Sequence, residues 1–413
     1  MKTFHELYLE ILKQETKEGR HLLEDYNPYH MDCLLHPEKY APVIHTEKCE
    51  ECAYEKACVN SCVFDAIEKR EDGTVHIDPE KCAGCGVCVD VCKLERLAAN
   101  KDVFPVLKAV REEGRDVYAL IAPAFTGQFG EKATPGRLRT AFKALGFKGM
   151  VEVAIFADIL TLKEALEFDT HIRTTSDFQL TSCCCPVWIA MIRGIYGELV
   201  PHMPGAVSPM IAAGRAVKKI YPGAVTVFVG PCLAKKKEAK EPDIADAVDY
   251  VLTFQEIKEL FDAASIAPCE MEEDEKVHSS RAGRIYARTG GVSEAVQKTV
   301  MQLHPDREIM VHPVQADGVK ACRQMIEDIR AGKTEANFFE GMACQGGCVG
   351  GPKALLANEE GRELVNRYGD EALYQTPLEN PYVIELIEKL GFYTVEDFLE
   401  KSDILTRDFG GHA

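Results

Sequence analysis

The sequence contains no run of about 18 apolar residues of the kind that crosses a membrane. Its first residues, Met-Lys-Thr-Phe-His-Glu-Leu-Tyr, lack the long apolar stretch of a secretory signal peptide. Basic residues are outnumbered by acidic ones, 48 to 66, and the net charge of −18 argues against a nucleic-acid-binding surface. We therefore expect a cytoplasmic protein with no membrane segment and no nucleic-acid partner.

Cysteine, in contrast, is abundant. Seventeen cysteines among 413 residues are too many for incidental core positions. In a cytoplasmic chain thiols stay reduced, so clustered cysteines indicate metal binding more often than disulfides. The length allows two or three domains. Cys33, Cys269 and Cys322 belong to no motif, and we interpret them as structural thiols.

Three cysteine-containing loops organise the chain. They are Thr-Ser-Cys-Cys-Cys-Pro-Val-Trp at 181–188, Gly-Pro-Cys-Leu-Ala-Lys at 230–235 and Met-Ala-Cys-Gln-Gly-Gly-Cys-Val-Gly-Gly at 342–351. In the third loop, glycines between Cys344 and Cys348 let the backbone approach an inorganic core closely. No single loop supplies four thiolates. The sequence therefore predicts that the three loops converge on one cluster.

Eight further cysteines form two runs between residues 46 and 100. The spacing of the first run is C-x2-C-x5-C-x3-C, over Cys49, Cys52, Cys58 and Cys62. The spacing of the second is C-x2-C-x2-C-x3-C, over Cys82, Cys85, Cys88 and Cys92, which is the bacterial ferredoxin pattern. Residues 46–100 thus resemble a two-cluster ferredoxin domain. The alternative, a pair of structural zinc sites, explains the interleaved spacing poorly.

The ferredoxin resemblance implies which cysteines share a cluster, because in that fold the last cysteine of each run binds the other cluster. One [4Fe–4S] cluster would be held by Cys49, Cys52, Cys58 and Cys92. The other would be held by Cys82, Cys85, Cys88 and Cys62. The x5 spacing, and Val63 and Lys93 where Pro is usual, are departures that concern local loop geometry rather than the number of ligands.

From residue 101 onward the pattern is α/β. Strands are expected at 117–121, 151–156, 224–229 and 251–253, and helices at 135–145, from 161 and at 254–264. Alternating strands and helices predict parallel sheets covered by helices, with ligand loops at the strand ends. We divide the chain into a helical extension at 1–45, with a helix at 4–23 for packing or dimer contacts, the ferredoxin-like region at 46–100 and a domain at 101–413.

Taken in order, the three loops resemble the three signature motifs of [FeFe]-hydrogenases: Thr-Ser-Cys-Cys-Pro-x-Trp, Pro-Cys-x-x-Lys and Met-Ala-Cys-x-Gly-Gly-Cys. The likeness runs from about residue 46 to about 395 and includes Thr-Gly-Gly-Val at 289–292. It implies an H-cluster domain of two α/β lobes with parallel-rich sheets, preceded by a bacterial 2[4Fe–4S] ferredoxin-like α+β domain. The triple cysteine at 183–185 is similar to a divergent clade, often called group D, that includes members assigned to sensing.

The family resemblance implies a third [4Fe–4S] cluster, held by Cys185, Cys232, Cys344 and Cys348. Cys348 would also bridge to a two-iron unit carrying CO, cyanide and an azadithiolate. Lys235 would donate a hydrogen bond to a cyanide, unless it is a surface lysine of its Lys-Lys-Lys run. Met342 would lie beside the two-iron unit.

The proton-transfer thiol depends on the alignment. Alignment on Pro186 assigns that role to Cys184, whereas alignment on Thr181-Ser182 assigns it to Cys183 and makes Cys184 the ligand. We prefer the first alignment because Pro186 and Trp188 fix the exit of the loop into the following helix.

The family proton route continues through two glutamates at a spacing of three, which Glu164 and Glu167 match on one helix face. Two solvated helix glutamates are the structural alternative. Other positions depart from the family pattern, namely Ala124, Pro204, Met210 and Gly230. Pro204 stands where the relay serine aligns, and proline has neither a hydroxyl nor an N–H. We therefore expect the cofactor to bind, with slow turnover or another proton route.

Three functions compete at this stage. The first is an iron hydrogenase that oxidises H2 and reduces protons, with electrons passing through two [4Fe–4S] clusters to ferredoxin or another redox partner, and with its two-iron unit installed by separate maturases. The second is an H2 sensor or regulator. The third is a hydrogenase-like iron–sulfur assembly protein without the two-iron unit.

Overall fold

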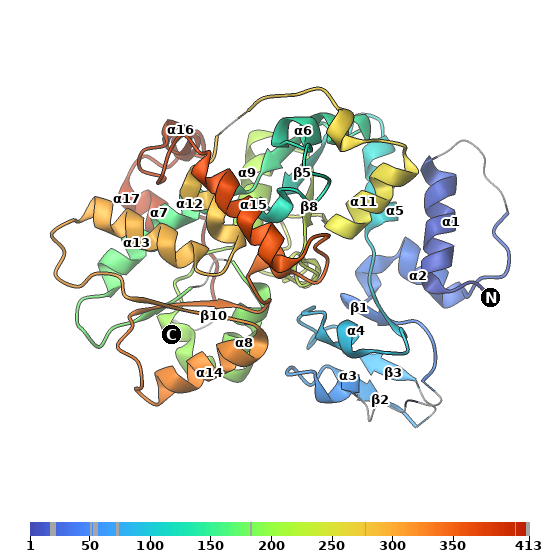
Figure 1. Cartoon of the computed structure of the whole chain (residues 1–413), viewed down its shortest axis with the longest axis horizontal. Helices are drawn as coiled ribbons and strands as arrows, with labels where there is room; N and C mark the ends of the chain where they lie inside the picture. Colours follow the sequence, from blue (N-terminus) through green and yellow to red (C-terminus); the bar gives the residue numbers. More distant parts are fainter. Residues whose placement is uncertain are drawn as a thin grey trace.

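A four-stranded parallel sheet lies at the centre of the larger part of the molecule (Figure 1). Its order is β6-β5-β8-β9, and its bounds are β5 Val117–Ile121, β6 Gly149–Glu152, β8 Val225–Gly230 and β9 Tyr250–Thr253. Every residue of β5 and β8 is buried, as expected for parallel strands covered on both faces. The predicted strand at 117–121 is confirmed, and those at 224–229 and 251–253 are confirmed to within one residue.

The computed structural model describes residues 1–16, 22–49, 52, 57–71, 74–181, 184–276, 278–400 and 402–409. Cys183 and residues 17–21 of the helix predicted at 4–23 lie outside these residues. The described part of that helix ends at Thr16, and residues 22 and 23 are not helical. Within them, no helix has the length and apolar character needed to span a bilayer.

Helices cover both faces of this sheet, and local sequence signals explain where they begin. Helix α6, Pro135–Ala144, begins after Thr134, whose side chain accepts a hydrogen bond from the Arg137 N–H. Helix α11, Phe254–Ala263, begins with a capping box formed by Thr253 and Glu256. Both helices are close to their predicted bounds.

The prediction of a strand at 151–156 is wrong from residue 153 onward. Strand β6 ends at Glu152, and residues from Ala154 onward form α7, Ala154–His171, which begins seven residues before the helix expected from 161. Helices α9, Pro209–Ile220, α12, Arg281–Arg284, and α13, Gly291–Leu303, all pack against α7. Because α7 is apolar on several sides, its first turns lack the 3.6-residue periodicity that marks a helix.

A second parallel sheet forms the other lobe, in the order β10-β11-β7. Its strands are β7 Gln179–Leu180, β10 Pro313–Asp317 and β11 Phe338–Met342. The first predicted loop follows β7 and the third follows β11, while the second follows β8 of the other sheet. All three cysteine loops therefore leave the carboxyl ends of parallel strands, which is where ligands bind in open α/β sheets. The two parallel-rich lobes confirm the predicted fold class.

The ferredoxin-like region contains two antiparallel strand pairs. Strand β1, Val43–His45, pairs with β4, Leu97–Ala99, and β2, Ile67–Lys69, pairs with β3, Val75–Ile77. Short helices α3, Ala57–Asn60, and α4, Val87–Val91, carry cysteines of the two runs. Because β1 belongs to this sheet, the last residues of the predicted extension lie within the ferredoxin-like region.

Helix α1 of the extension, Phe4–Thr16, packs against α11 and against α2, Pro28–Leu35. Its buried face includes Leu7, Tyr8 and Leu12. The remaining helices are α5 Val103–Arg111, α8 Pro186–Ile195, α10 Lys235–Glu238, α14 Val319–Arg330, α15 Asn358–Asp370, α16 Pro381–Lys389 and α17 Val395–Glu400.

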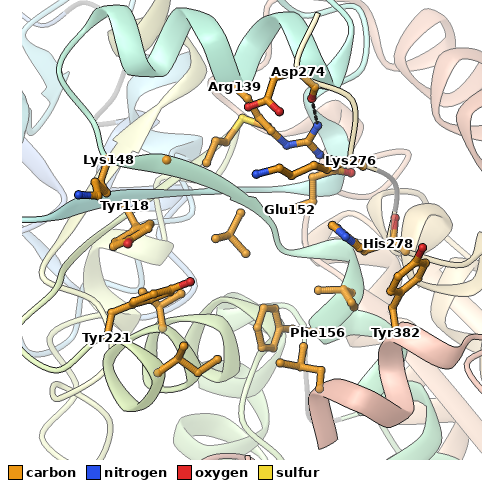
Figure 2. A pocket seen from close by; sticks show the side chains of 18 of the residues that line it. Tyr118, Arg139, Lys148, Glu152, Phe156, Tyr221, Asp274, Lys276, His278 and Tyr382 are labelled. Atoms are coloured by element: carbon orange, nitrogen blue, oxygen red, sulfur yellow. Dashed lines mark hydrogen bonds and ion pairs between the residues drawn. The ribbon is translucent and has the colours of Figure 1, made fainter. Parts of the chain in front are cut away.

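Strand β6 is an edge of the four-stranded sheet, paired only with β5 among the described strands. Its outer side borders a cleft of about 560 Å³ between α6, α9 and α16 (Figure 2).

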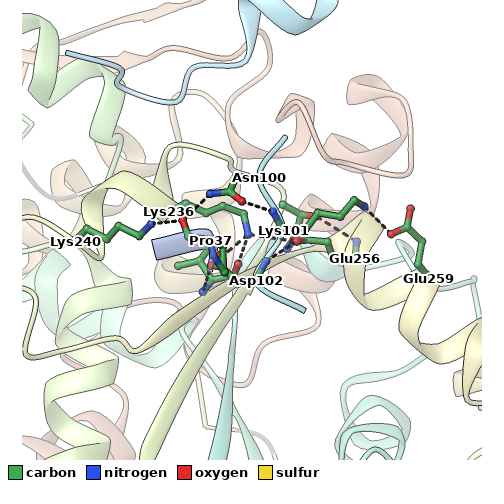
Figure 3. Close-up of polar contacts among 10 residues, drawn as sticks. Pro37, Asn100, Lys101, Asp102, Lys236, Lys240, Glu256 and Glu259 are labelled. Atoms are coloured by element: carbon green, nitrogen blue, oxygen red, sulfur yellow. Dashed lines mark hydrogen bonds and ion pairs between the residues drawn. The ribbon is translucent and has the colours of Figure 1, made fainter. Parts of the chain in front are cut away.

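A buried ionic network fixes the linker that joins the ferredoxin-like region to the larger domain (Figure 3). The Lys236 ammonium lies 3.3 Å from carboxylate oxygens of both Asp102 and Glu256 and donates to the Val251 carbonyl at 2.6 Å. Burial alone would raise the pKa of Glu256, but Lys236 and Lys101 reverse the effect and the net pKa is lowered. The linker is thus held by charges that have little access to water.

Candidate cluster-binding sites

The three predicted loops meet at one cavity of about 70 Å³, enough for several water-sized groups. Four of its lining cysteines come from three loops that are far apart in sequence: Cys185, Cys232, Cys344 and Cys348. Burial and then neighbouring thiols, Cys184 and Cys232 among them, raise the pKa of Cys185 to about 12. Burial and the same kind of crowding raise the pKa of Cys344 and of Cys348 well above the ordinary range. The four sulfurs therefore lie close enough to influence one another.

The first loop is held by Trp188. The indole N–H donates to the Thr181 carbonyl at 3.0 Å, and Cys185 caps α8, which has Pro186 at its first position. The Ala343 N–H, from the third loop, lies 3.4 Å from the Cys185 sulfur. Pro186 and Trp188 thus fix the exit of the loop, as the preferred alignment assumed.

The third loop requires glycine at Gly346 and Gly347, whose φ angles are +78° and +89°. A β-carbon on Gly347 would lie 2.6 Å from the Thr289 nitrogen, so the Thr-Gly-Gly-Val stretch backs directly onto this loop. The Asp317 carboxylate accepts hydrogen bonds from the Gly346 N–H and the Thr289 hydroxyl, each at 3.0 Å. No sequence motif marks Asp317, which is the last residue of β10, a strand that only the structure revealed.

Lys235 is not a surface lysine, because only 6% of it is exposed. Its ammonium lies 2.6 Å from a carboxylate oxygen of Glu238, one helical turn later. Burial lowers the pKa of Lys235, but Glu238 and the thiols of Cys232 and Cys348 outweigh burial and the net pKa is raised. The cavity therefore has a fixed positive charge in its wall, and Glu238 is a buried partner that sequence reasoning missed.

Cys184 and Met342 lie side by side in the cavity wall, with their sulfurs 4.0 Å apart. The alternative relay thiol, Cys183, lies outside the described residues. Cys322 is buried close by, and its sulfur lies 3.3 Å from the Met342 carbonyl. Cys33 is also fully buried, and the Cys269 sulfur lies 3.6 Å from the Phe129 carbonyl.

The solvated alternative for the two helix glutamates is wrong, since Glu164 is fully buried and Glu167 is 7% exposed. Glu167 pairs with buried Lys163. Burial raises the pKa of Glu167, and Lys163 opposes the rise. Neither glutamate lines the cavity, whereas Ala157 of the same helix does. Glu164 is two turns further on, about 10 Å along the helix axis.

A pair of hydroxyl groups lies between the cavity and Glu164. Tyr286 lines the cavity, and its hydroxyl is 2.8 Å from the hydroxyl of Thr161, one turn before Glu164 on α7. Neither residue carries a sequence motif, so this pair became visible only in the structure.

Of the four positions that depart from the family pattern, only Met210 lines the cavity. Met210 lines the cavity and Ala124 is buried, with 1% of each exposed. A β-carbon on Gly230 would lie 2.7 Å from the Phe228 ring, so no larger side chain fits there without movement. Pro204 is buried but does not line the cavity.

The two ferredoxin runs interleave in space. Cys49, Cys52, Cys58 and Cys92 line one small cavity together with His45, whose ring nitrogen lies 3.4 Å from the Cys49 sulfur. In the second group, burial and then the thiols of Cys85 and Cys62 raise the pKa of Cys82 to about 11. Burial and the thiols of Cys85, Cys82 and Cys62 raise the pKa of Cys88. Each group therefore contains the last cysteine of the other run.

Zinc–sulfur bonds of about 2.3 Å require the ligand sulfurs to lie within about 4 Å of one another. Among the described residues, no three His, Cys, Asp or Glu side chains are grouped closely enough to hold one metal ion.

The loop of the second ferredoxin run contacts the loops of the main cavity. A β-carbon on Gly84 would lie 2.8 Å from the Cα of Ala234, and one on Gly86 would lie 3.1 Å from Pro352. The thiol of Cys85 is close enough to Cys344 to contribute to the raised pKa of that residue. The second ferredoxin group and the main group thus lie next to each other.

Two protein-family models match parts of the chain. The family model for the iron only hydrogenase large subunit, C-terminal domain, matches residues 115–352, more than half of the chain. A model for a 4Fe-4S binding domain matches residues 74–97.

Curated relatives include two kinds of protein. The NADP-reducing hydrogenase subunit HndD of Solidesulfovibrio fructosivorans is 27% identical over 75% of this chain and 63% of its own length. Iron hydrogenase 1 of Clostridium pasteurianum is 28% identical over 60% of this chain and 50% of its own length. The chain therefore spans only about half to two thirds of these relatives. Cytosolic iron-sulfur assembly component 3 of Bos taurus is 24% identical over 78% of this chain and 81% of its own length.

Among solved structures, a variant of the [FeFe]-hydrogenase HydA1 from Chlamydomonas reinhardtii superposes with a TM-score of 0.62 at 23% identity. The match covers 74% of this chain and 98% of that one. At this identity the likeness shows a shared fold.

Proposed function

Because the chain belongs to the iron-only hydrogenase family, we propose that it oxidises H2 and reduces protons reversibly at an H-cluster. The observation that carries the proposal is the convergence of four thiols with Cys184, Met342 and Lys235 on one cavity. We assign the cubane ligands to Cys185, Cys232, Cys344 and Cys348.

The donor set fits the implied group. Four thiolates suit a [4Fe–4S] cluster, and the largely apolar wall around Met210, Phe228 and Pro209 suits the uncharged CO ligands of a two-iron unit. When bound, that two-iron unit would supply the open metal site and the base for H2 cleavage. The protonated Lys235 would donate a hydrogen bond to an anionic cyanide ligand, using a proton not engaged by Glu238.

The protein's own residues would then handle protons and electrons. Cys184 lies at the wall of the cavity and would relay protons, and Glu164 and Glu167 would continue the route along α7. The serine link is lost at Pro204, so the Tyr286–Thr161 pair is our candidate for the intervening step. An uncharged hydroxyl pair is a poor proton store, which agrees with the expectation of slow turnover.

Electrons would pass through two ferredoxin-type [4Fe–4S] clusters, held by the two interleaved groups of cysteines. The second group lies against the main cavity. The first group would therefore be the entry point for ferredoxin or another redox partner. Cytoplasmic location, installation of the two-iron unit by maturases and a domain boundary at 100 belong to the same proposal. The first boundary moves from 45 to a point before β1, because β1 pairs with β4 of the ferredoxin-like region.

An assembly function is the second candidate, since the relatives include iron–sulfur assembly components at comparable coverage. An infrared spectrum of the protein after maturation separates the two, because CO and cyanide bands require a two-iron unit. Bands followed by H2 turnover with reduced ferredoxin support the hydrogenase. A fully loaded [4Fe–4S] protein with no such bands would contradict it, and bands with negligible turnover would favour a sensor.

A further inference from the structure

The cavity of the first ferredoxin group contains an imidazole that none of the functions described so far uses. His45 lines this cavity together with the four cysteines of the group, Cys49, Cys52, Cys58 and Cys92. The Nε2 atom of His45 lies 3.4 Å from the Cys49 sulfur. A histidine nitrogen donates or accepts depending on which of the two ring nitrogens carries the hydrogen. The position of that hydrogen therefore decides how the ring acts on the cluster site.

A backbone hydrogen bond places the hydrogen on Nε2. The Val75 N–H donates to the Nδ1 atom of His45 at 3.4 Å. A backbone N–H only donates, so Nδ1 is the acceptor and carries no hydrogen. The hydrogen of the neutral ring is then on Nε2, and this atom points its N–H at Cys49. Because a cysteine that binds a cluster is a thiolate, its sulfur accepts this bond, and the ring needs no positive charge to donate it.

Strand pairing holds the ring in this position. His45 is the last residue of β1 and pairs with Leu97 of β4, while Val75 is the first residue of β3. The next residue, Thr46, donates from its N–H and its hydroxyl to the Arg96 carbonyl, at 2.9 and 3.1 Å. The ring is half-buried, so water competes little for its N–H. The contact with sulfur is therefore fixed by two sheets rather than made by a mobile side chain.

The charges near the two ferredoxin groups differ in sign. Lys93 lines the cavity of the first group. Burial and then neighbouring thiols raise the pKa of Cys49, and the charge of Lys69 opposes the rise. In the second group, burial raises the pKa of Cys85, and the Asp90 carboxylate adds to the rise. The first group is therefore the one better suited to hold additional negative charge.

Additional negative charge is what reduction brings to a cluster. A reduced [4Fe–4S] cluster carries one more electron than the oxidised one, and hydrogen bonds to its sulfurs are among the factors that set its potential. A donor N–H binds the more negative sulfur more strongly, so it favours the reduced state. In the second group, the Cys62 sulfur accepts from the backbone N–H of Ala66 at 3.4 Å, a bond that side-chain substitutions elsewhere leave in place.

We propose that His45 is a positioning residue of the first cluster, whose Nε2–H donates to the Cys49 sulfur and raises the reduction potential of that cluster. The inference rests on the proposed assignment of a [4Fe–4S] cluster to the first group. A higher potential at this group would hold electrons at the end of the cluster chain that meets the redox partner. It would favour electron flow outward from the main cavity.

The direct test is an EPR-monitored redox titration of the full-length protein with its [4Fe–4S] clusters in place. His45→Leu removes the donor, so the equilibrium constant for reducing the first cluster should fall at least about threefold, which is about 28 mV for a one-electron step. The signal of that cluster is identified by its loss from the double variant Cys49→Ala, Cys92→Ala. The potential of the second cluster should stay unchanged, because its backbone donor remains.

Two further variants separate the hydrogen bond from packing. His45→Gln keeps an N–H donor of similar reach, so its first-cluster potential should lie closer to that of the unmodified protein than the potential of His45→Leu does. His76→Leu makes the same substitution at an exposed position of β3 and should leave the potential unchanged. An unshifted potential in His45→Leu, or equal shifts in His45→Leu and His45→Gln, overturns this proposal alone. An unmodified protein without a first-cluster signal overturns the cluster assignment and the proposal together.

A measurement on the unmodified sequence decides the question if His45→Leu fails to assemble the cluster. Protein labelled with ¹⁵N only in its histidine rings should show a ¹⁵N coupling to the reduced first cluster in pulsed EPR, transmitted through the N–H···S bond. The same coupling should persist in labelled His76→Leu and should be absent from labelled His45→Gln. A first-cluster signal without any ¹⁵N coupling would show that the imidazole does not bond to the cluster, and would overturn the proposal.

Discussion

The backbone of Gly84 lies against that of Ala234, so closely that a β-carbon on residue 84 would be 2.8 Å from the Ala234 Cα. Gly84 lies between two cysteines of the second ferredoxin run, and Ala234 lies two residues after Cys232. This contact joins the outer and inner candidate cluster sites through neighbouring loops. It also gives a physical reason for glycine at position 84, where φ is +72°.

Gly84→Ala should therefore lower the stability of the protein by more than the positive φ alone predicts. A positive φ costs a non-glycine residue about 1–2 kcal/mol, and the close contact adds a displacement of the two loops. Gly114→Ala is the matched control, because Gly114 has φ +80° with no atom near its added β-carbon. Both variants should lower the melting temperature, but only Gly84→Ala should slow electron transfer between clusters in rapid-freeze EPR. Equal transfer rates would show that the contact does not position the clusters.

Cys184→Ala should nearly abolish H2 turnover in the matured protein, because it removes the thiol at the cavity wall. Alanine is small and apolar, so the side chain of Met342 keeps an apolar neighbour. Infrared bands of the two-iron unit should persist. Cys269→Ala changes a thiol outside the cavity and should leave both turnover and bands intact. Unchanged turnover in the Cys184 variant would remove it from the proton route and bring Cys183 forward.

Asp158 predicts a pH dependence of stability. It is fully buried, which raises its pKa to about 6, although it accepts hydrogen bonds from the N–H and hydroxyl of Ser280 and from the Gly283 N–H. The pKa of Asp158 is higher in the folded state than in the unfolded state, so its protonated form favours folding. This contribution to the free energy of unfolding is fully present below about pH 4 and is lost as pH rises through about 6.

Asp158→Asn removes the titration. The stability advantage of the unmodified protein over this variant should be larger at pH 5 than at pH 7 in urea unfolding, with cluster content checked by visible absorption at each pH. An advantage that stays constant or grows with pH would contradict the raised pKa.

Lys236→Met should destabilise the fold strongly. Its ammonium is the shared partner of Asp102 and Glu256, and removing it leaves two buried carboxylates without their cation. The loss of one partner from a buried ion pair costs about 3–5 kcal/mol. Lys237→Met is the adjacent control, since Lys237 only approaches exposed Glu80 at 3.5 Å, a contact of about 0–1 kcal/mol. Urea midpoints of the two variants should differ clearly, and similar midpoints would show that the network contributes little.

Double cysteine variants test the interleaving of the ferredoxin runs. If Cys49 and Cys92 hold the same cluster, Cys49→Ala combined with Cys92→Ala should lose about four irons per chain. Cys49→Ala combined with Cys62→Ala, two residues of one run, should lose about eight, because two clusters are affected. Iron analysis and EPR spin counts measure the difference. The reverse pattern would mean that each run holds its own cluster.

Much of the site was predicted from local sequence. Cysteine spacing, and glycines beside thiolates, are short-range patterns that identify ligand loops without knowledge of the fold. Strands such as Val117–Ile121 were also predicted, because a buried parallel strand is a continuous apolar run. The start of α7 was missed for the same reason, since a helix buried on several sides also reads as a continuous apolar run.

Only the tertiary structure decided which residues contact one another. Glu238 became the partner of Lys235, Thr161 met Tyr286, and Glu164 and Glu167 turned out to be buried rather than solvated, because burial depends on neighbours distant in sequence. Sequence determined which side chains are able to bind iron and sulfur, while packing determined their distances, their charges and their hydrogen-bond partners.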